Sequence, residues 1–235
     1  MEKIGLIGGL SYESTIIYYE HINKLVNKQL GEGHSAKLIL YSMDSGEVQE
    51  AFESDKIELG KELLIEAAKT VEKAGASCLL MCCNSVHKVA EDVQKAVNIP
   101  LIHICDSVVE TIDSLKLKKI GLLGTNFTMH DSFYKKRLTE KGVEVLLPDE
   151  DDRNYMHQVI FNELVVGKFL PESKENFKRI IDYMIEKGAE GVILGCTEIP
   201  LLINQDDVSI PVFNTACLHA EKAVNFVLER SKQTI

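Results

Sequence analysis

The chain has 235 residues, a hydrophobic content of 45% and a formal net charge of −10. That length can bury a full core, as one large domain or two smaller ones. The acidic balance argues against a nucleic-acid partner, because phosphates call for clustered Lys and Arg. No apolar run approaches the roughly 18 residues of a membrane span, and Met1–Gly5 lacks the character of a signal peptide. We therefore expect a cytoplasmic globular protein that binds neither membranes nor nucleic acid.

Short apolar runs alternate with longer amphipathic stretches along the whole chain. The apolar runs predict strands at Lys3–Ile7, Lys37–Ser42, Cys78–Cys82, Leu101–Ile104, Lys119–Leu123, Val143–Leu146, Gly191–Leu194 and Val212–Phe213. The amphipathic stretches predict helices at Ser14–Leu30, Ile57–Ala74, Val86–Val97, Asp106–Leu115, His130–Lys141, Asn154–Val166, Ser173–Lys187 and Thr215–Ser231. This alternation is typical of parallel sheets covered by helices on both faces. Gly31–Gly33 is expected to be a loop, and the acidic run Asp149–Asp152 a solvated turn.

Three segments of the first half of the chain recur in the second half, in the same order. The pairs are Ile4–Gly9 with Ile120–Thr125, Ala74–Ser85 with Lys187–Glu198, and Asn98–Ile102 with Ser209–Phe213. A period of about 110 residues is too long for a solenoid repeat. The repeat instead predicts two related α/β units.

The predicted fold is α/β, with two pseudo-symmetric three-layer α/β/α domains and mainly parallel sheets. The first domain is expected to comprise residues 1–104 and a C-terminal helix at 212–235, and to carry Cys83. The second is expected to comprise residues 105–211 and to carry Cys196. Ligands of open α/β sheets bind beyond the carboxyl ends of the strands. We therefore expect an active-site cleft between the two domains.

The repeat places one cysteine at the same point of both halves. Cys83 and Cys196 lie 113 residues apart, and each directly follows an apolar strand. Cys82 aligns with Gly195, so the repeat favours Cys83 over its neighbour as the reactive thiol. The remaining cysteines are expected to be reduced core residues: Cys78, Cys105 and Cys217. The cysteines show no paired metal-type spacing, so no metal site is expected.

Two equivalent thiols indicate proton transfer at a carbon centre. Racemisation removes a proton from one face of a carbon and delivers one to the other face, so it needs two acid–base groups. A thiol has an unperturbed pKa of about 8.5 and can serve as either partner after modest tuning. Asn84, Ser85 and Thr197 follow the two cysteines and supply hydrogen-bond donors for a substrate carboxylate.

Five segments carry a more specific pattern. They are Gly8–Thr15, Leu80–His87, Leu123–Met129, Val192–Leu202 and Asn214–Ala220. Together they resemble the aspartate/glutamate racemase family, which works without pyridoxal phosphate, and most of all its aspartate racemase branch. The resemblance covers nearly the whole chain, and the segment around Cys196 is its most specific part.

This resemblance implies a cofactor-independent racemase with the active site between two pseudo-symmetric domains. Cys83 and Cys196 would be its catalytic thiols. The resemblance implies substrate contacts at Asn84, Ser85, Val86, Thr197 and Glu198, with the loop at Leu10 closing one side. It also implies a small-molecule amino-acid substrate, no cofactor and, commonly, a homodimer.

Other polar residues are weaker candidates. His87 is expected to be a helix-surface or capping residue rather than a proton relay, and His103 could approach the cleft because it follows a strand. Glu163 could contact a substrate amine. Some aspartate racemases hold the substrate side chain with an arginine in the loop after the second strand. The corresponding loop, Tyr41–Val48, contains no Arg or Lys, so the substrate side chain stays open.

The leading prediction is therefore an amino-acid racemase acting on aspartate, on glutamate or more broadly. A second possibility keeps the fold and changes the reaction, because paired-cysteine relatives include hydantoin racemases, maleate isomerases and arylmalonate decarboxylases. A third is a two-lobed amino-acid-binding protein without turnover, against which the intact thiol pair argues. A thiol-redox role is less favoured, because strand-end thiols in opposite lobes need not come close enough to bond.

Overall fold

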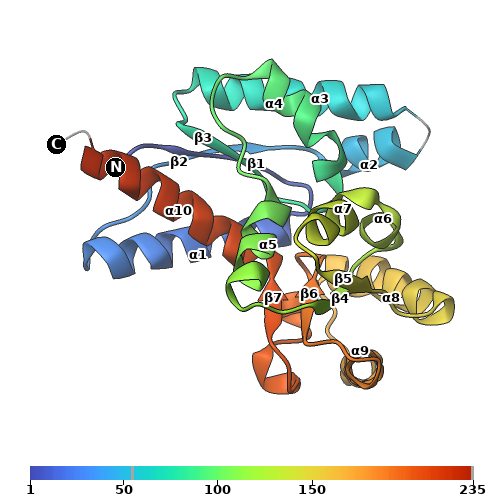
Figure 1. Ribbon diagram of the computed structural model, residues 1–235. Helices are drawn as coiled ribbons and strands as arrows, with labels where there is room; N and C mark the ends of the chain where they lie inside the picture. Colours follow the sequence, from blue (N-terminus) through green and yellow to red (C-terminus); the bar gives the residue numbers. More distant parts are fainter. Residues whose placement is uncertain (54–55, 234–235) are drawn as a thin grey trace. The chain divides into compact units, whose positions relative to one another are not determined.

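Parallel sheets organise the chain into two compact units. A computed structural model describes residues 1–53 and 56–233 (Figure 1). The first unit comprises Met1–Ile104 and Ala216–Ile235, and the second comprises Cys105–Thr215. Every strand pair in the described residues is parallel. The predicted α/β class with mainly parallel sheets is therefore confirmed.

The sheet of the first unit has the strand order β2-β1-β3 within the described residues. Its strands are β1 (Ile4–Gly8), β2 (Leu38–Ser42) and β3 (Cys78–Met81). The strand predicted at Leu101–Ile104 is wrong beyond its first residue. Leu101 forms an isolated bridge with Leu79, whereas Ile104 already begins helix α5 (Ile104–Ser114).

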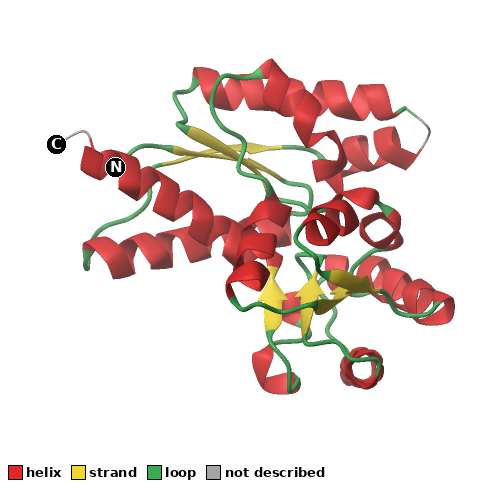
Figure 2. Cartoon of the chain, viewed as in Figure 1, coloured by secondary structure: helices red, strands yellow, loops and turns green. Residues whose placement is uncertain are grey.

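Helices cover both faces of this first sheet (Figure 2). One face packs on α1 (Tyr12–Leu30) and α10 (Thr215–Gln233), and the other on α3 (Ile57–Lys73) and α4 (Ala90–Ala96). Because side chains alternate along a strand, Ile4 and Leu6 join the first core and Ile7 joins the second. A further helix, α2 (Ser45–Glu53), follows β2.

The sheet of the second unit has the order β5-β4-β6-β7 within the described residues. Its strands are β4 (Lys119–Leu123), β5 (Glu144–Leu146), β6 (Gly191–Leu194) and β7 (Val212–Asn214). Its helices, besides α5, are α6 (Asn126–His130), α7 (Ser132–Glu140), α8 (Glu150–Asn162) and α9 (Pro171–Glu186). Buried residues of α8 and α9 pack with β4 and β6 in one core cluster. Short 3-10 helices occur at η1 (Ser85–Val89), η2 (Leu164–Val166), η3 (Ile199–Leu201) and η4 (Gln205–Asp207).

A pair of glutamines shows that the sequence repeat is also a structural repeat. Gln94 and Gln205 lie 111 residues apart and each anchors the segment that follows it. Each Nε2 donates to a carbonyl oxygen, of Ile99 at 3.1 Å and of Ile210 at 3.0 Å. Each Oε1 accepts from a backbone N–H, of Leu101 at 2.7 Å and of Val212 at 3.0 Å. The same amide fork therefore holds Leu101 beside β3 and β7 beside β6.

Two sequence predictions are corrected by hydrogen bonding. Residues 212–215 were expected in the first domain, but β7 pairs with β6 through Val192 and Val212, so the second unit continues to Thr215. The acidic run Asp149–Asp152 is not a turn. Asp149 caps α8 by accepting from the N–H of Asp152 at 2.9 Å, and the acids after it occupy the first turn. Carboxylates are favoured there because they face the positive end of the helix dipole.

Several helix boundaries also differ from the prediction. The helix expected at Val86–Val97 is divided into η1 and α4. The helix expected at His130–Lys141 is α7, and α6 precedes it because the Thr125 side chain caps a separate short helix. The loop expected after β2 is short, since α2 begins at Ser45.

Replacing Gly9 with alanine should destabilise the first unit by about 3 kcal/mol, through left-handed strain and a backbone clash together. Gly9 follows β1 with φ of +79°, and an added Cβ would lie 2.6 Å from the backbone nitrogen of Met43. Gly33→Ala is the matched control: its φ is +89°, but nothing lies within 4 Å of its Cβ position. The control should lose only about 1 kcal/mol. Equal losses in urea unfolding would contradict the clash.

Candidate active site

The first candidate thiol lies where β3 ends. The N–H of Cys82 donates to the carbonyl oxygen of Ile7 at 2.9 Å, which continues the β1–β3 ladder to the strand exit. Cys83 follows, half-buried, at the carboxyl edge of the sheet. Cys82 itself is fully buried in the core shared with α1 and α10, and burial raises its pKa well above that of a free thiol. The geometry thus agrees with the choice of Cys83 over Cys82.

The neighbours of Cys83 come from two segments. The Ser85 hydroxyl oxygen lies 3.4 Å from the Cys83 sulfur. Asn84 and Val86 are both buried. Leu10, from the loop after β1, packs against the same apolar cluster as Cys83. Of the predicted neighbours, Ser85 thus contacts the Cys83 sulfur, and Leu10 and Cys83 share one apolar cluster.

The loop after β1 is fixed by short hydrogen bonds. The N–H of Gly9 donates to Thr15 Oγ1 at 2.8 Å, and Ser14 Oγ donates to the carbonyl of Cys82 at 2.8 Å. Ser11 caps α1 by accepting from the Ser14 N–H. The start of α1 is thereby tied to the residue before Cys83.

The second candidate thiol lies where β6 ends, in the second unit. The N–H of Gly195 donates to the Leu123 carbonyl at 2.7 Å, in the same way as Cys82 donates to Ile7. Cys196 follows and is half-buried. Its thiol donates to Glu198 Oε2 at 2.9 Å, and Thr197 Oγ1 donates to the same oxygen at 3.1 Å. Thr197 and Glu198 are both buried.

Glu198 gives the second thiol a partner that the sequence repeat did not predict. Sequence reasoning treated Glu198 as a substrate contact, but here its carboxylate accepts directly from Cys196. A carboxylate at hydrogen-bond distance can take or return the proton of a thiol. For Cys83, the Ser85 hydroxyl lies within hydrogen-bond distance of the sulfur. The two thiols thus have chemically different neighbours.

The remaining predicted candidates lie elsewhere in the two units. Glu163 ends α8, and its carboxylate accepts from the buried Ser173 hydroxyl at 2.5 Å. It therefore links α8 to the start of α9, and its contact with a substrate amine stays a prediction. His87 was expected to be a helix-surface or capping residue; it is buried, and the His103 ring lies 4.6 Å from it between centroids. The helix-surface alternative is therefore wrong.

The other cysteines lie in environments that disfavour a thiolate. Burial raises the pKa of Cys78 to about 12 and that of half-buried Cys217 to about 11. Burial also raises the pKa of Cys105 well above its ordinary value. These thiols stay protonated at neutral pH, which agrees with a packing role.

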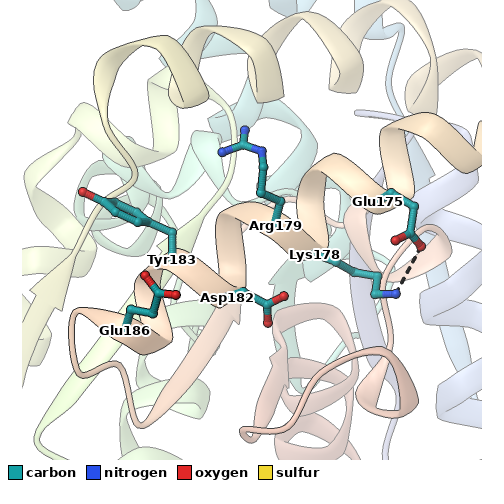
Figure 3. A pocket seen from close by; sticks show the side chains of 6 residues that line it. All are labelled: Glu175, Lys178, Arg179, Asp182, Tyr183 and Glu186. Carbon is teal, nitrogen blue, oxygen red and sulfur yellow. Dashed lines mark hydrogen bonds and ion pairs between the residues drawn. The ribbon is translucent and has the colours of Figure 1, made fainter.

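An open hollow on the second unit does not coincide with either thiol. It is lined by Glu175, Lys178, Arg179, Asp182, Tyr183 and Glu186 (Figure 3). All six come from α9, and Lys178 pairs with Glu175 at 3.1 Å. This charged face of one helix contains no residue of the candidate site.

The family model for Asp/Glu/Hydantoin racemase matches residues 7–223. The chain belongs to this racemase family. Members of the family are racemases, so the protein is an isomerase. Within the described residues, no group of three or more His, Cys, Asp or Glu is placed to hold a metal ion, and no helix is long and apolar enough to cross a membrane.

Relatives of this racemase family match over nearly the whole chain. A Yersinia pestis structure, provisionally assigned as an Asp/Glu racemase, is 44% identical with a TM-score of 0.91 and covers 97% of this chain and 100% of its own. An aspartate racemase homologue from Pyrococcus horikoshii OT3 is 40% identical with a TM-score of 0.85, at 97% and 100% coverage. The broad specificity amino-acid racemase RacX of Bacillus subtilis is 23% identical over 96% of this chain and 98% of its own.

Proposed function

We propose that this racemase is a cofactor-independent amino-acid racemase in which Cys83 and Cys196 are the two acid–base groups. One observation carries the proposal: the duplicated fold delivers a half-buried thiol after the matching strands β3 and β6. A two-base racemisation needs two such groups, one for each face of the substrate carbon.

The proposed reaction moves one proton off the α-carbon and another onto it. A thiolate at one cysteine takes the α-proton, and its sulfur becomes a thiol. The thiol at the other cysteine then gives its proton to the opposite face of the planar intermediate and becomes a thiolate. The enzyme is left ready for the other enantiomer, so the reaction runs in both directions. When Cys196 acts as the base, its thiol first passes its proton to the Glu198 carboxylate, which leaves the thiolate that takes the α-proton.

We also propose how the substrate is held. Asn84, Ser85 and Thr197 would donate to its carboxylate, and Val86 and the Leu10 loop would line the site. Glu163 remains the proposed contact of the amine. We further propose that the protein is a homodimer located in the cytoplasm.

Aspartate is the leading substrate, with glutamate or a broader range as the alternative. The 40% identical Pyrococcus protein is described as an aspartate racemase homologue. RacX, described as broad in specificity, supports the alternative. The segment Tyr41–Val48 contains no Arg or Lys to bind a side-chain carboxylate. Neutral amino acids therefore remain candidate substrates, and the exchange experiment includes them.

Solvent exchange tests the proposal most directly. The protein is incubated in D2O with L- and D-aspartate, L- and D-glutamate and a panel of neutral amino acids, and deuterium at the α-carbon is followed by NMR. We expect deuterium to enter at least one amino acid, together with formation of its enantiomer. Ligand-induced thermal stabilisation without any exchange would instead identify a binding protein. A covalent adduct at one thiol on exposure to maleate, seen by mass spectrometry, would favour an isomerase of the maleate type.

A further inference from the structure

A buried histidine holds the backbone of the first thiol loop. His87 lies four residues after Cys83 and is only 2% exposed. Its Nδ1 lies 2.8 Å from the carbonyl oxygen of Cys83. Its Nε2 accepts from the backbone N–H of Ile104 at 3.2 Å. Because a backbone N–H can only donate, Nε2 carries no proton, and Nδ1–H must donate to Cys83.

A second histidine supports the first. The His219 ring lies 5.6 Å from the His87 ring between centroids and is fully buried. Its Nε2–H donates to the Ile102 carbonyl at 2.6 Å, which leaves Nδ1 to accept from the Tyr18 hydroxyl at 2.8 Å. Burial is the main cause that lowers the pKa of His219 to about 3. The ring is therefore neutral at neutral pH and serves as a fixed hydrogen-bonding spacer.

Together these rings fix two short backbone segments of the first unit. One is the thiol loop at Cys83. The other is Ile102–Ile104, the last residues before the chain passes to the second unit at Cys105. A ring bonded at both nitrogens cannot rotate without breaking one of the two bonds. The loop that bears Cys83 is thereby held at the same place relative to Ile104.

The second thiol loop is held differently. The repeat places Pro200, which lies 113 residues after His87, at the equivalent position. A proline side chain cannot donate a hydrogen bond. The Cys196 carbonyl accepts instead from the N–H of Ile199 at 3.2 Å, and Glu198 bonds the Cys196 thiol. The histidine is thus a feature of the Cys83 loop alone and not of the duplicated fold.

We propose that His87 is a positioning residue for Cys83, acting by the bond from its Nδ1–H to the Cys83 carbonyl. The inference rests on the proposed racemase function. Misplacing a reacting group by about 1 Å can cost around a hundredfold in rate. Loss of this bond should slow the proton transfers to and from Cys83. The proton transfers to and from Cys196 should keep nearly their wild-type rates.

Enantiomer-resolved exchange in D2O separates these steps. Cys83→Ala and Cys196→Ala first identify which enantiomer each thiol deprotonates, from initial rates of α-deuterium uptake. His87→Ala should then slow exchange of the Cys83 enantiomer at least about tenfold, and change exchange of the other enantiomer less than about twofold. Loss of fold would lower both rates together. An equal fall of both in the soluble variant therefore overturns the inference.

Two conservative variants keep the test decisive even where His87→Ala does not fold. In His87→Asn, the side-chain amide can occupy the place of Nδ1 and still donate to Cys83. In His87→Gln, the amide reaches the place of Nε2 and bonds Ile104 instead. We expect His87→Asn to retain most of the exchange at Cys83 and His87→Gln to lose it. Equal rates in the two variants would contradict the role of that bond.

His130 provides a matched control. Its Nδ1 lies 2.9 Å from the carbonyl oxygen four residues earlier, that of Asn126, but the residue is exposed. His130→Ala should therefore leave both exchange rates at the wild-type value. If the wild-type protein shows no exchange at all, the proposed racemase function is rejected. If the wild-type protein does exchange but His87→Ala slows the exchange of both enantiomers equally, only the role of His87 is rejected.

Discussion

Replacing either Cys83 or Cys196 with alanine should lower racemisation by at least about a thousandfold, because acid–base catalysis by one group supplies factors of this size. A two-base reaction stops when one face of the carbon loses its proton donor or acceptor. Both thiols are half-buried, so alanine removes little packing. The expected loss is therefore one of chemistry and not of fold.

The partial reaction should survive in each single variant. In Cys83→Ala, Cys196 can still exchange the α-proton of the enantiomer that faces it, and the converse holds for Cys196→Ala. Formation of the opposite enantiomer is measured by chiral chromatography, and exchange by NMR in D2O. Cys217→Ala is the control, since Cys217 is another half-buried thiol whose pKa is raised to about 11 by burial. A variant of Cys83 or Cys196 that racemises at the wild-type rate would remove that residue from the mechanism.

The sequence predicted the strands that position the thiols because their signals are local. An apolar run followed by a small polar residue marked the exits of β3 and β6 at Cys83 and Cys196. The internal repeat favoured Cys83 over Cys82, and the structure places Cys82 in the core. These features depend on residue type and spacing, which are visible in one dimension.

Other segments could form either a strand or turn or the start of a helix, and the sequence alone does not show which of these forms. The apolar run Leu101–Ile104 has strand character, but Ile104 begins α5, where His87 accepts from its N–H. The acids at Asp149–Asp152 look like a solvated turn until Asp149 is seen to cap α8. In both cases a side chain bonds a backbone N–H at the start of a helix, and the sequence pattern alone does not show that bond.

The side-chain contacts of each thiol could not be predicted from the spacing of residues in the sequence. The residues Glu198 and Ser85 each follow a thiol by two positions, and only the side-chain conformation shows that both turn back toward sulfur. His87 contacts Ile104, 17 residues later in the sequence, and His219 of α10, which the spacing around Cys83 does not show. The repeat predicted equivalent thiols. The structure places a carboxylate beside the Cys196 sulfur and a hydroxyl beside the Cys83 sulfur.

Because a carboxylate lies beside Cys196 and a hydroxyl beside Cys83, Glu198→Gln tests most directly whether the two thiols are deprotonated in different ways. Glutamine keeps the size of the side chain and an acceptor oxygen for Thr197, but it cannot take the proton of Cys196. We expect racemisation to fall by about a hundredfold or more, the usual contribution of a positioned general base. Exchange of the enantiomer that Cys196 deprotonates should account for most of the fall.

The same measurement separates this role from a substrate contact. A carboxylate that only held the substrate would slow α-deuterium exchange of both enantiomers alike, whereas a proton acceptor for Cys196 slows chiefly the exchange of the enantiomer that Cys196 deprotonates. Glu175→Gln is the control, because that carboxylate pairs with Lys178 on α9 and lies outside the candidate site. Equal effects on the exchange of the two enantiomers would assign Glu198 to substrate binding, as the sequence alone had indicated. A one-sided effect would show that a duplicated fold carries two thiols of different chemistry for a reaction that must be reversible.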